Sequence, residues 1–364
     1  MPAASVGYNG CAVSRAADQL SSLAPALAFL LAGVPLAALL DELGFFEAAA
    51  RSMARRRPTG VPVAWLWALA AVTTAVLNLD TTVVLLTPLF VRLARRSGHD
   101  PLGVAAVPLL LAAFASSFLP VSNLTNLIVV ERLGADVADV VGHLALPSLA
   151  AVLVGWVAYR RRWPTVLPVE PDGRPDRRAL AIGGAVVVAL LAGFVVGPSV
   201  GVQPWMCALV ADLVLVVVTR AIPWREVPIG TAALVAAIAV AVALVVPSDR
   251  IGDLVQGAGP AGLVAVSGAA TVAANAVNNL PALLVVVDGV DRTSWGVWAW
   301  LLGVNVGSVL LPLGALANLL WWRIARDEGV EVGLRRYART TVPVALPALA
   351  AAVAVLVVER LVWP

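Results

Sequence analysis

Lysine is absent from this sequence: every lysine-or-arginine position is an arginine. A chain without lysine has no Walker A lysine for P-loop ATP hydrolysis and no side-chain amine for a Schiff base. The two cysteines, Cys11 and Cys207, are too few for a disulfide framework or a thiolate metal site. Charged residues make up only 13% of the chain, and the arginines fall in short loops between apolar segments. The sequence therefore predicts no cofactor, no bound metal and no nucleic-acid partner.

Apolar length is what the sequence has in excess. Of its 364 residues, 60% are hydrophobic, and the mean hydropathy is +0.92. A soluble domain could not bury so much apolar surface, so we expect an all-α polytopic membrane protein surrounded by lipid. Met1–Asp18 is mixed and polar, with no basic start ahead of an apolar core, and it does not resemble a signal peptide.

Residues 61–91 are flanked by arginines at both ends, with Arg55–Arg57 before them and Arg92, Arg95 and Arg96 after them. Arginine-rich flanks are typical of the cytoplasmic side of a membrane protein. The middle of the segment, Asn78–Thr82 (N-L-D-T-T), is polar. We predict a re-entrant hairpin that opens inward and turns at mid-membrane. The alternative is two tightly joined spans, which would place Asn78–Thr82 outside.

Residues 102–133 contain a polar stretch, F-L-P-V-S-N-L-T-N at Phe118–Asn126, between two apolar runs. Proline removes a helical hydrogen bond, and non-helical backbone is tolerated at membrane depth only inside protein or beside a wet cavity. The pattern predicts a discontinuous transmembrane helix, the element from which secondary transporters build substrate sites. A proline-kinked helix, whose serine and asparagines merely join helices, is the alternative.

The second half follows a cytoplasmic linker at residues 160–178, which is rich in arginine and proline. Two scaffold helices are expected within residues 179–226. A second hairpin with a polar middle is predicted at residues 260–287; its flanks are rich in aspartate, so it should open outward. A second broken helix is predicted at residues 298–322, because glycines and a proline interrupt its apolar run.

The two halves match each other in order and spacing. Asn78 of the first hairpin corresponds to Asn278 of the second, and Pro120–Asn126 corresponds to Pro312–Asn318 with proline, leucine and the final asparagine in register. Because one hairpin opens inward and the other outward, residues 1–159 and 227–364 are interpreted as inverted repeats, as in alternating-access carriers. The first repeat lacks a counterpart of the 179–226 helices. Either the scaffold is reduced or the true start lies upstream, and the sequence does not decide between these.

The expected substrate site lies where the two hairpin tips meet the two helix breaks. It gathers amides, hydroxyls and one carboxylate: Asn78, Asp80, Thr81, Thr82, Ser122, Asn123, Thr125 and Asn126 from the first half, and Asn275, Asn278, Asn279, Asn305, Ser308 and Asn318 from the second. With no arginine or histidine in the set, a multiply charged anion would meet no fixed countercharge. The other interpretation of each asparagine is that it caps a hairpin tip or helix end.

Asp80 is the candidate coupling residue, carrying a proton or helping to bind a cation. A carboxylate near the bilayer centre costs roughly 2.5–3.5 kcal/mol on insertion scales, and such residues usually handle ions or protons. The alternative is a tip aspartate bonded to backbone amides. Asp212 also lies in the middle of an apolar span, where a structural pairing is expected. A remote alternative function, an intramembrane aspartyl protease, would need Asp80 and Asp212 as a close pair.

At these positions the chain resembles the ArsB-type arsenite and antimonite permeases of the ion transporter superfamily. The resemblance is carried by Leu39–Glu47, Asn78–Pro88, the S-N-L-T-N core, Asn278–Pro281 and Leu313–Trp321. It implies a multi-pass carrier in the bacterial inner membrane. The carrier would export trivalent metalloid oxyacids, driven by the proton gradient or coupled to a separate ATPase subunit. A homodimer is one assembly that the sequence leaves open.

The chain departs from the permease pattern in its second broken helix. Where these permeases commonly have Cys-Asp-Leu-Gly-Pro-Lys, this chain has V-N-V-G-S-V at Val304–Val309, so Asn305 replaces an acid and no basic residue follows. Ala315 replaces a serine, Asn318 replaces a threonine, and Leu79 replaces an asparagine before Asp80. Two alternatives remain. One is a sodium/proton antiporter, which would be expected to carry more membrane carboxylates. The other is a dicarboxylate or citrate carrier, which would be expected to match Ser-Asn-Thr motifs in both halves.

Overall fold

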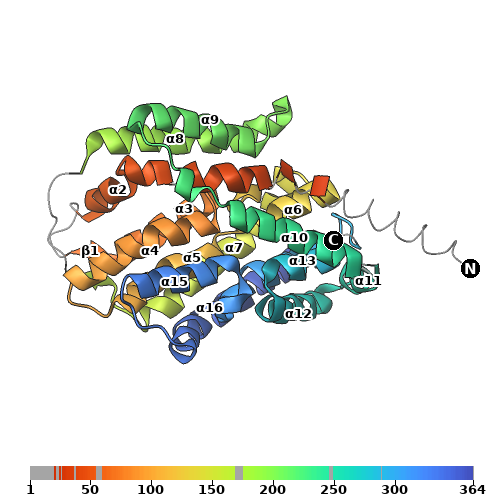
Figure 1. The fold of residues 1–364 in the computed structure, drawn as a ribbon. Coiled ribbons are helices and arrows are strands. Elements are labelled where there is room, and N and C mark those ends of the chain that lie inside the picture. The colour runs from red at the N-terminus through yellow and green to blue at the C-terminus, as the bar shows by residue number, and fades with distance from the viewer. Residues whose placement is uncertain are drawn as a thin grey trace, which may run out of the picture.

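The computed structural model describes residues 20–21, 24–25, 27–36, 38–54, 60–168, 175–245, 249–287 and 289–363. The described part is mostly helical, with residues 27–36 and 38–42 helical ahead of the labelled elements (Figure 1). The first half then has α2 (Phe45–Ala54), α3 (Val63–Val76), α4 (Leu79–Arg96), α5 (Pro101–Phe114), α6 (Leu124–Leu133) and α7 (Val137–Arg160). The second half has α8 (Arg177–Val196), α9 (Pro204–Thr219), α10 (Ile229–Val245), α11 (Asp249–Gln256), α12 (Pro260–Val277), α13 (Asn279–Val287), α14 (Trp295–Asn305), α15 (Leu316–Asp327) and α16 (Leu334–Val362). Short 3-10 turns form η1 (Pro120–Ser122), η2 (Gly197–Val200), η3 (Trp224–Glu226), η4 (Gly307–Leu310) and η5 (Pro312–Gly314).

The expectation of purely helical structure is wrong at one place. Strands β1 (Val61–Pro62) and β2 (Val166–Leu167) pair antiparallel, with Val61 opposite Leu167. Both of these side chains are buried, so the strand pair adds a small apolar contact to the core. Gly60 permits the approach, because a Cβ at this residue would lie 2.2 Å from the Leu167 carbonyl oxygen. The ladder ties the linker to the start of the first predicted hairpin.

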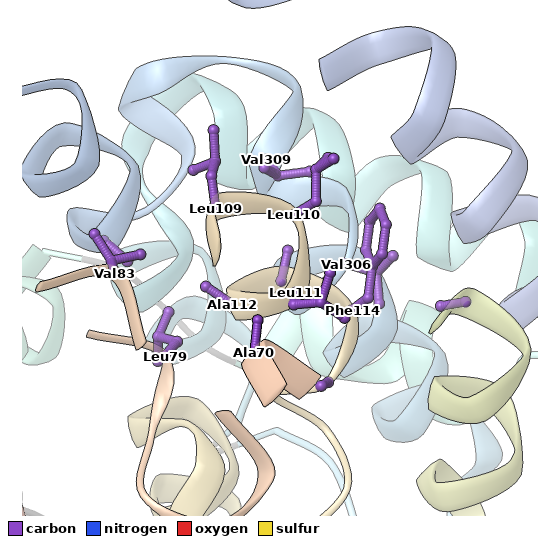
Figure 2. Close-up of a cluster of buried hydrophobic side chains, with 14 of the residues drawn as sticks. Ala70, Leu79, Val83, Leu109, Leu110, Leu111, Ala112, Phe114, Val306 and Val309 are labelled. Atoms are coloured by element: carbon purple, nitrogen blue, oxygen red, sulfur yellow. The ribbon is translucent and has the colours of Figure 1, made fainter. Parts of the chain in front are cut away.

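Helix α5 occupies the centre of the molecule. All its side chains from Leu102 to Phe114 are buried, and a helix that is apolar all round is one that packs on every side. Figure 2 shows Leu109–Ala112 and Phe114 of α5 among Ala70 of α3, Val83 of α4 and Val309 of η4. Both halves of the chain therefore contribute to one core around α5.

Four helices in the described part are long and apolar enough to cross a membrane: α7, α8, α12 and α16. Shorter apolar helices include α3, α5 and α9. Of these, α3 has 14 residues and is about 21 Å long, which is less than the roughly 30 Å of a bilayer core. This length suits one arm of a re-entrant hairpin better than a full span.

Several element boundaries differ from the predicted ones because caps and charged turns extend helices beyond their apolar run. The second broken helix was expected over residues 298–322, but α14 begins at Trp295 and α15 ends at Asp327. Ser294 caps α14 by accepting from the Gly296 amide at 3.2 Å. Helix α4 likewise continues past residue 91 through an arginine-rich last turn to Arg96. Helix α8, capped by Asp176, begins at Arg177, two residues before its predicted start at residue 179.

Each predicted hairpin begins and ends on the same side of the molecule, and the two hairpins lie on opposite sides. Beside β1, the α4 residues Arg92 and Arg95 bond to Glu328, and Arg336 bonds to Asp100 at 2.8 Å. At the other end, where Figure 1 places α11 and the C-terminus, Arg292 after α13 donates to the Gly134 carbonyl at 2.8 Å. The α3–α4 pair thus starts and ends at the arginine-rich side, and the α12–α13 pair at the other side.

Glycine at position 303 sets the close contact between α12 and α14. A Cβ at Gly303 would lie 2.4 Å from the Ser267 carbonyl oxygen and 2.5 Å from the Ala270 Cβ. We expect Gly303→Ala to destabilise the protein by about 1–3 kcal/mol through overpacking. Gly268→Ala in the facing helix is the matched control, because a Cβ there would meet no atom within 4 Å. Thermal unfolding of both purified variants checks this, and equal melting temperatures would contradict it.

Candidate functional site

The first helix break lies between α5 and α6, and side chains of the break itself hydrogen-bond to its backbone. Asn126 donates from Nδ2 to the Ser116 carbonyl at 2.8 Å and to the Leu119 carbonyl at 3.0 Å. Asn123 caps α6 by accepting from the Thr125 amide at 3.1 Å. These bonds satisfy backbone groups that the interrupted helix leaves without partners, which a break at membrane depth requires.

The second break, between α14 and α15, has the same geometry. Asn318 donates to the Ser308 carbonyl at 2.9 Å and to the Leu311 carbonyl at 3.1 Å, which are ten and seven residues earlier, the same spacing as for Asn126. The residue before each proline is extended, with φ −134° at Leu119 and −125° at Leu311. The predicted match between Pro120–Asn126 and Pro312–Asn318 therefore extends to backbone shape and hydrogen bonding.

Two asparagines of the second hairpin hold the second break. Asn275 donates to the Gly307 carbonyl and accepts from the Leu311 amide, both at 2.8 Å. Asn278, between α12 and α13, donates to the Leu313 carbonyl at 3.1 Å. Its backbone has φ 83° and ψ 151°, a combination found almost only at glycine, so the tip is strained at this residue. The second hairpin tip and second break thus form one hydrogen-bonded unit.

The first hairpin tip is joined to the first break in a similar way. Asn78 caps α4 by accepting from the Thr81 amide at 2.8 Å. Ser122 in the break donates from its hydroxyl to the Ala75 carbonyl at 2.7 Å. Thr74 of α3 and Thr82 of α4 bond through their hydroxyls at 2.9 Å, which holds the two arms together. For Asn78, the capping interpretation is therefore what the structure shows.

Asn305 connects the two halves of the chain. Its Oδ1 accepts from Thr125 Oγ1 at 2.6 Å and from Asn123 Nδ2 at 3.0 Å. Its Nδ2 donates to Ser117 Oγ and to Asn126 Oδ1, both at 2.9 Å. The side chain is buried, so all four bonds are made away from bulk solvent. An amide supplies both donors and acceptors at this position, whereas an ionised carboxylate would turn an oxygen toward Asn126 Oδ1.

Parts of both hairpin tips and both helix breaks line one small cavity. Its volume is about 20 Å³, which corresponds to roughly one or two water molecules. The polar lining consists of Asp80, Asn123 and Asn279. The apolar lining is Leu30, Leu79, Leu124, Leu280, Ala315, Leu316 and Ala317. Asn78 and Asp80 also line a neighbouring cavity of about 10 Å³.

Asp80 is half-buried at this cavity, and no described residue forms a hydrogen bond or ion pair with its carboxylate. The tip amides that were the alternative partners are engaged elsewhere: the Thr81 amide bonds to Asn78 Oδ1, and the Thr82 amide bonds to the Asn78 carbonyl. The carboxylate is therefore held at the cavity by its backbone position and not by partners.

The predicted site residues thus have different roles in the structure. Asp80, Asn123 and Asn279 line the larger cavity, with Asn78 beside them. The others hold the tips and breaks in shape through hydrogen bonds: Thr82, Ser122, Thr125, Asn126, Asn275, Asn278, Asn305, Ser308 and Asn318. Thr81 is buried, and its hydroxyl has no partner among the described residues. Sequence reasoning missed Ser116 and Ser117, although two adjacent serines before a break were a visible signal.

Asp212 lies apart from this cavity, on α9. It is buried, and within the described residues its Oδ1 atom has no hydrogen-bond partner and its carboxylate no ion pair. The expected structural pairing of Asp212 is therefore not found. Asp212 is also absent from the described lining of the Asp80 cavity, which does not favour a carboxylate dyad.

Comparison with known proteins places this geometry in context. The family model CitMHS, described as citrate transporter, matches residues 16–303. An arsenical pump membrane protein of Escherichia coli (strain K12) is 28% identical over 360 residues, covering 89% of this chain and 84% of that protein. An uncharacterized transporter of Mycobacterium tuberculosis (strain H37Rv) is 28% identical over 367 residues, covering 88% of this chain and 84% of its own length.

Two solved structures share the fold. The YdaH transporter of Alcanivorax borkumensis superposes with a TM-score of 0.62 at 16% identity, covering 100% of this chain and 90% of that one. MtrF of Neisseria gonorrhoeae, described among antimetabolite efflux pumps, gives a TM-score of 0.60 at 15% identity, covering 95% of this chain and 83% of that one. At these identities the likeness concerns the fold alone.

Proposed function

This chain belongs to the CitMHS family of membrane transporters, within the ion transporter superfamily, and on that premise we propose that it exports arsenite-type or antimonite-type metalloid oxyacids in exchange for protons. As a member of a transporter family it is not an enzyme, and the protease alternative is dropped. The observation that carries the proposal is the cavity at which Asp80, unpaired among the described residues, meets parts of both hairpin tips and both helix breaks.

The described lining of the cavity favours an uncharged oxyacid over citrate. A citrate anion would face the carboxylate of Asp80 and would find no arginine or histidine among the described lining residues. Arsenite is an uncharged trihydroxy acid at neutral pH, and its hydroxyls suit the carboxylate of Asp80 and the amide of Asn279, which both line the cavity. The arsenical pump relatives, at 28% identity, support the same substrate class.

Alternating access is the mechanism that we propose, with residues 1–159 and 227–364 as inverted repeats. Support comes from the matching hydrogen bonds of Asn126 and Asn318 at the two breaks. It also comes from the α3–α4 and α12–α13 pairs, which begin and end at opposite ends of the molecule. In this mechanism the breaks and tips form the substrate site, and Asp80 carries the coupled proton.

We expect expression of this chain to lower arsenite accumulation in a bacterial strain that lacks its own arsenite exporter. Excess citrate should leave the efflux unchanged, because the carboxylate of Asp80 opposes a second anion at the cavity. The measurement is cellular arsenic over time, with the protein confirmed in the membrane fraction. Unchanged accumulation would contradict the arsenite proposal. Sodium/proton exchange and dicarboxylate uptake in membrane vesicles would then distinguish the remaining transporter classes.

A further inference from the structure

The backbone amide before each break proline lies outside any helix. Leu119 and Leu311 precede Pro120 and Pro312, and both have extended backbone conformations. Their N–H groups therefore have no carbonyl partner four residues earlier. A backbone amide at membrane depth needs a partner within the protein, because bulk water does not reach it. The two halves of the chain supply this partner in different ways.

In the first half, Ser122 supplies the partner from within the break. Its hydroxyl accepts from the Leu119 amide at 3.2 Å and donates to the Ala75 carbonyl at 2.7 Å. Ala75 belongs to α3, the first arm of the first hairpin. One buried side chain thus satisfies the break and joins it to the hairpin arm.

In the second half, the partner comes from the hairpin arm itself. Asn275 of α12 accepts from the Leu311 amide at Oδ1 and donates from Nδ2 to the Gly307 carbonyl, both at 2.8 Å. Its Nδ2 also donates to the Thr271 carbonyl of its own helix at 2.8 Å, which fixes the orientation of the amide. The arm and the break are connected as in the first half, but the connecting side chain belongs to the arm.

The polar residue and a small residue are exchanged between the two halves. In the match between the two breaks, Ser122 corresponds to Gly314. In the match between the two hairpins, Ala75 corresponds to Asn275. Each half therefore has one hydrogen-bonding side chain and one small residue at this pair of positions, in opposite arrangement.

The space around Gly314 explains why both positions differ together. A Cβ at Gly314 would collide with the Ser308 carbonyl oxygen and would lie 2.8 Å from Asn275 Oδ1. The second break thus has no room for a serine where the first break has Ser122. The amide of Asn275 lies beside this glycine and makes the bond to the pre-proline amide in its place.

We propose that Asn275 and Ser122 are equivalent positioning residues, each of which fixes a break to its hairpin arm. Asn275 acts through the amide of Leu311, shortly before the residues Ala315–Ala317 that line the Asp80 cavity. It therefore sets where the second break presents these residues to the cavity. That the cavity serves a substrate rests on the proposed function, whereas the equivalence of the two side chains does not.

The equivalence is tested by building the second arrangement into the first half. Ser122→Gly removes the hydroxyl, and Ala75→Asn adds an amide at the position that Asn275 has in α12. We expect Ser122→Gly to lower the melting temperature of the purified protein by about 3 °C. Adding Ala75→Asn to this variant should restore at least half of the loss. In a chain that keeps Ser122, Ala75→Asn should bring no gain, because the Leu119 amide already has its partner.

Transport is the second measurement, because a residue that only stabilises the fold would leave the substrate site unchanged. Asn275→Leu should raise the KM for arsenite on the order of tenfold and change kcat by less than about threefold, because it displaces the cavity lining and leaves Asp80 in place. Ser267→Ala on the same helix is the matched control. The hydroxyl of Ser267 is buried and has no partner among the described residues, so its removal should leave KM unchanged.

Each result has a definite consequence. If the effects of Ser122→Gly and Ala75→Asn on the melting temperature simply add, the two side chains are not equivalent and the proposal is overturned. An unchanged KM for Asn275→Leu, in a protein that transports arsenite, would overturn the positioning role. If the wild type moves no arsenite, the proposed substrate is rejected, and the exchange in the first half still decides the equivalence.

Discussion

Asp80→Asn is expected to return arsenite accumulation to the level of cells that lack the transporter, with the protein still folded in the membrane. An amide cannot take up or release a proton, so energy coupling is lost even where the shape of the site is kept. Folding should survive because no described residue bonds to the Asp80 carboxylate, so no partner is left unsatisfied. In vesicles, arsenite-dependent proton movement should disappear together with transport.

Asp212→Asn is the matched control for this experiment. Asp212 is the other aspartate in the middle of an apolar span, and its Oδ1 also has no partner in the described part of the chain, but it lies on α9, away from the cavity. We expect this variant to transport arsenite as the wild type does. Full proton-coupled transport by a well-expressed Asp80→Asn would show that another group carries the proton.

Asn305→Ala is expected to cause the largest loss of stability among single polar substitutions at the site. The change removes four hydrogen bonds at once and leaves buried groups of Ser117, Asn123, Thr125 and Asn126 without that partner. Buried groups left unsatisfied cost about 1–3 kcal/mol each in soluble proteins, and bonds between membrane helices average less, so we expect a loss of about 2–4 kcal/mol. Thermal unfolding of detergent-solubilised protein measures it.

Thr340→Val provides the comparison for Asn305. It removes a buried polar group too, the Thr340 hydroxyl, but this hydroxyl bonds within its own helix to the Arg336 carbonyl, so the effect should be small. In double-mutant cycles, Asn305→Ala should be strongly non-additive with Thr125→Val and additive with Thr340→Val. Additivity with both would mean that the bonds of Asn305 do not couple the two halves.

The sequence alone determined where the chain is interrupted. Proline, asparagine and serine in the middle of apolar segments have few structural explanations, because backbone groups at membrane depth need partners. This rule located the breaks between α5 and α6 and between α14 and α15, and the turns at Asn78 and Asn278. The sequence also predicted the residue match between the two breaks, and its resemblance to known permeases identified the transporter superfamily.

Only the tertiary structure decided which polar residues meet. Asn305 and Thr125 are 180 residues apart, and no local pattern encodes their contact at 2.6 Å. From the sequence alone, the predicted candidates therefore could not be divided into residues that face the cavity and residues that hold the breaks in shape. The structure also shows the strands β1 and β2 in a chain expected to be helical, and among the described residues it gives Asp212 no expected pairing. The reason is physical: local sequence sets where backbone groups lack helical partners, whereas packing between distant helices sets which side chains satisfy them.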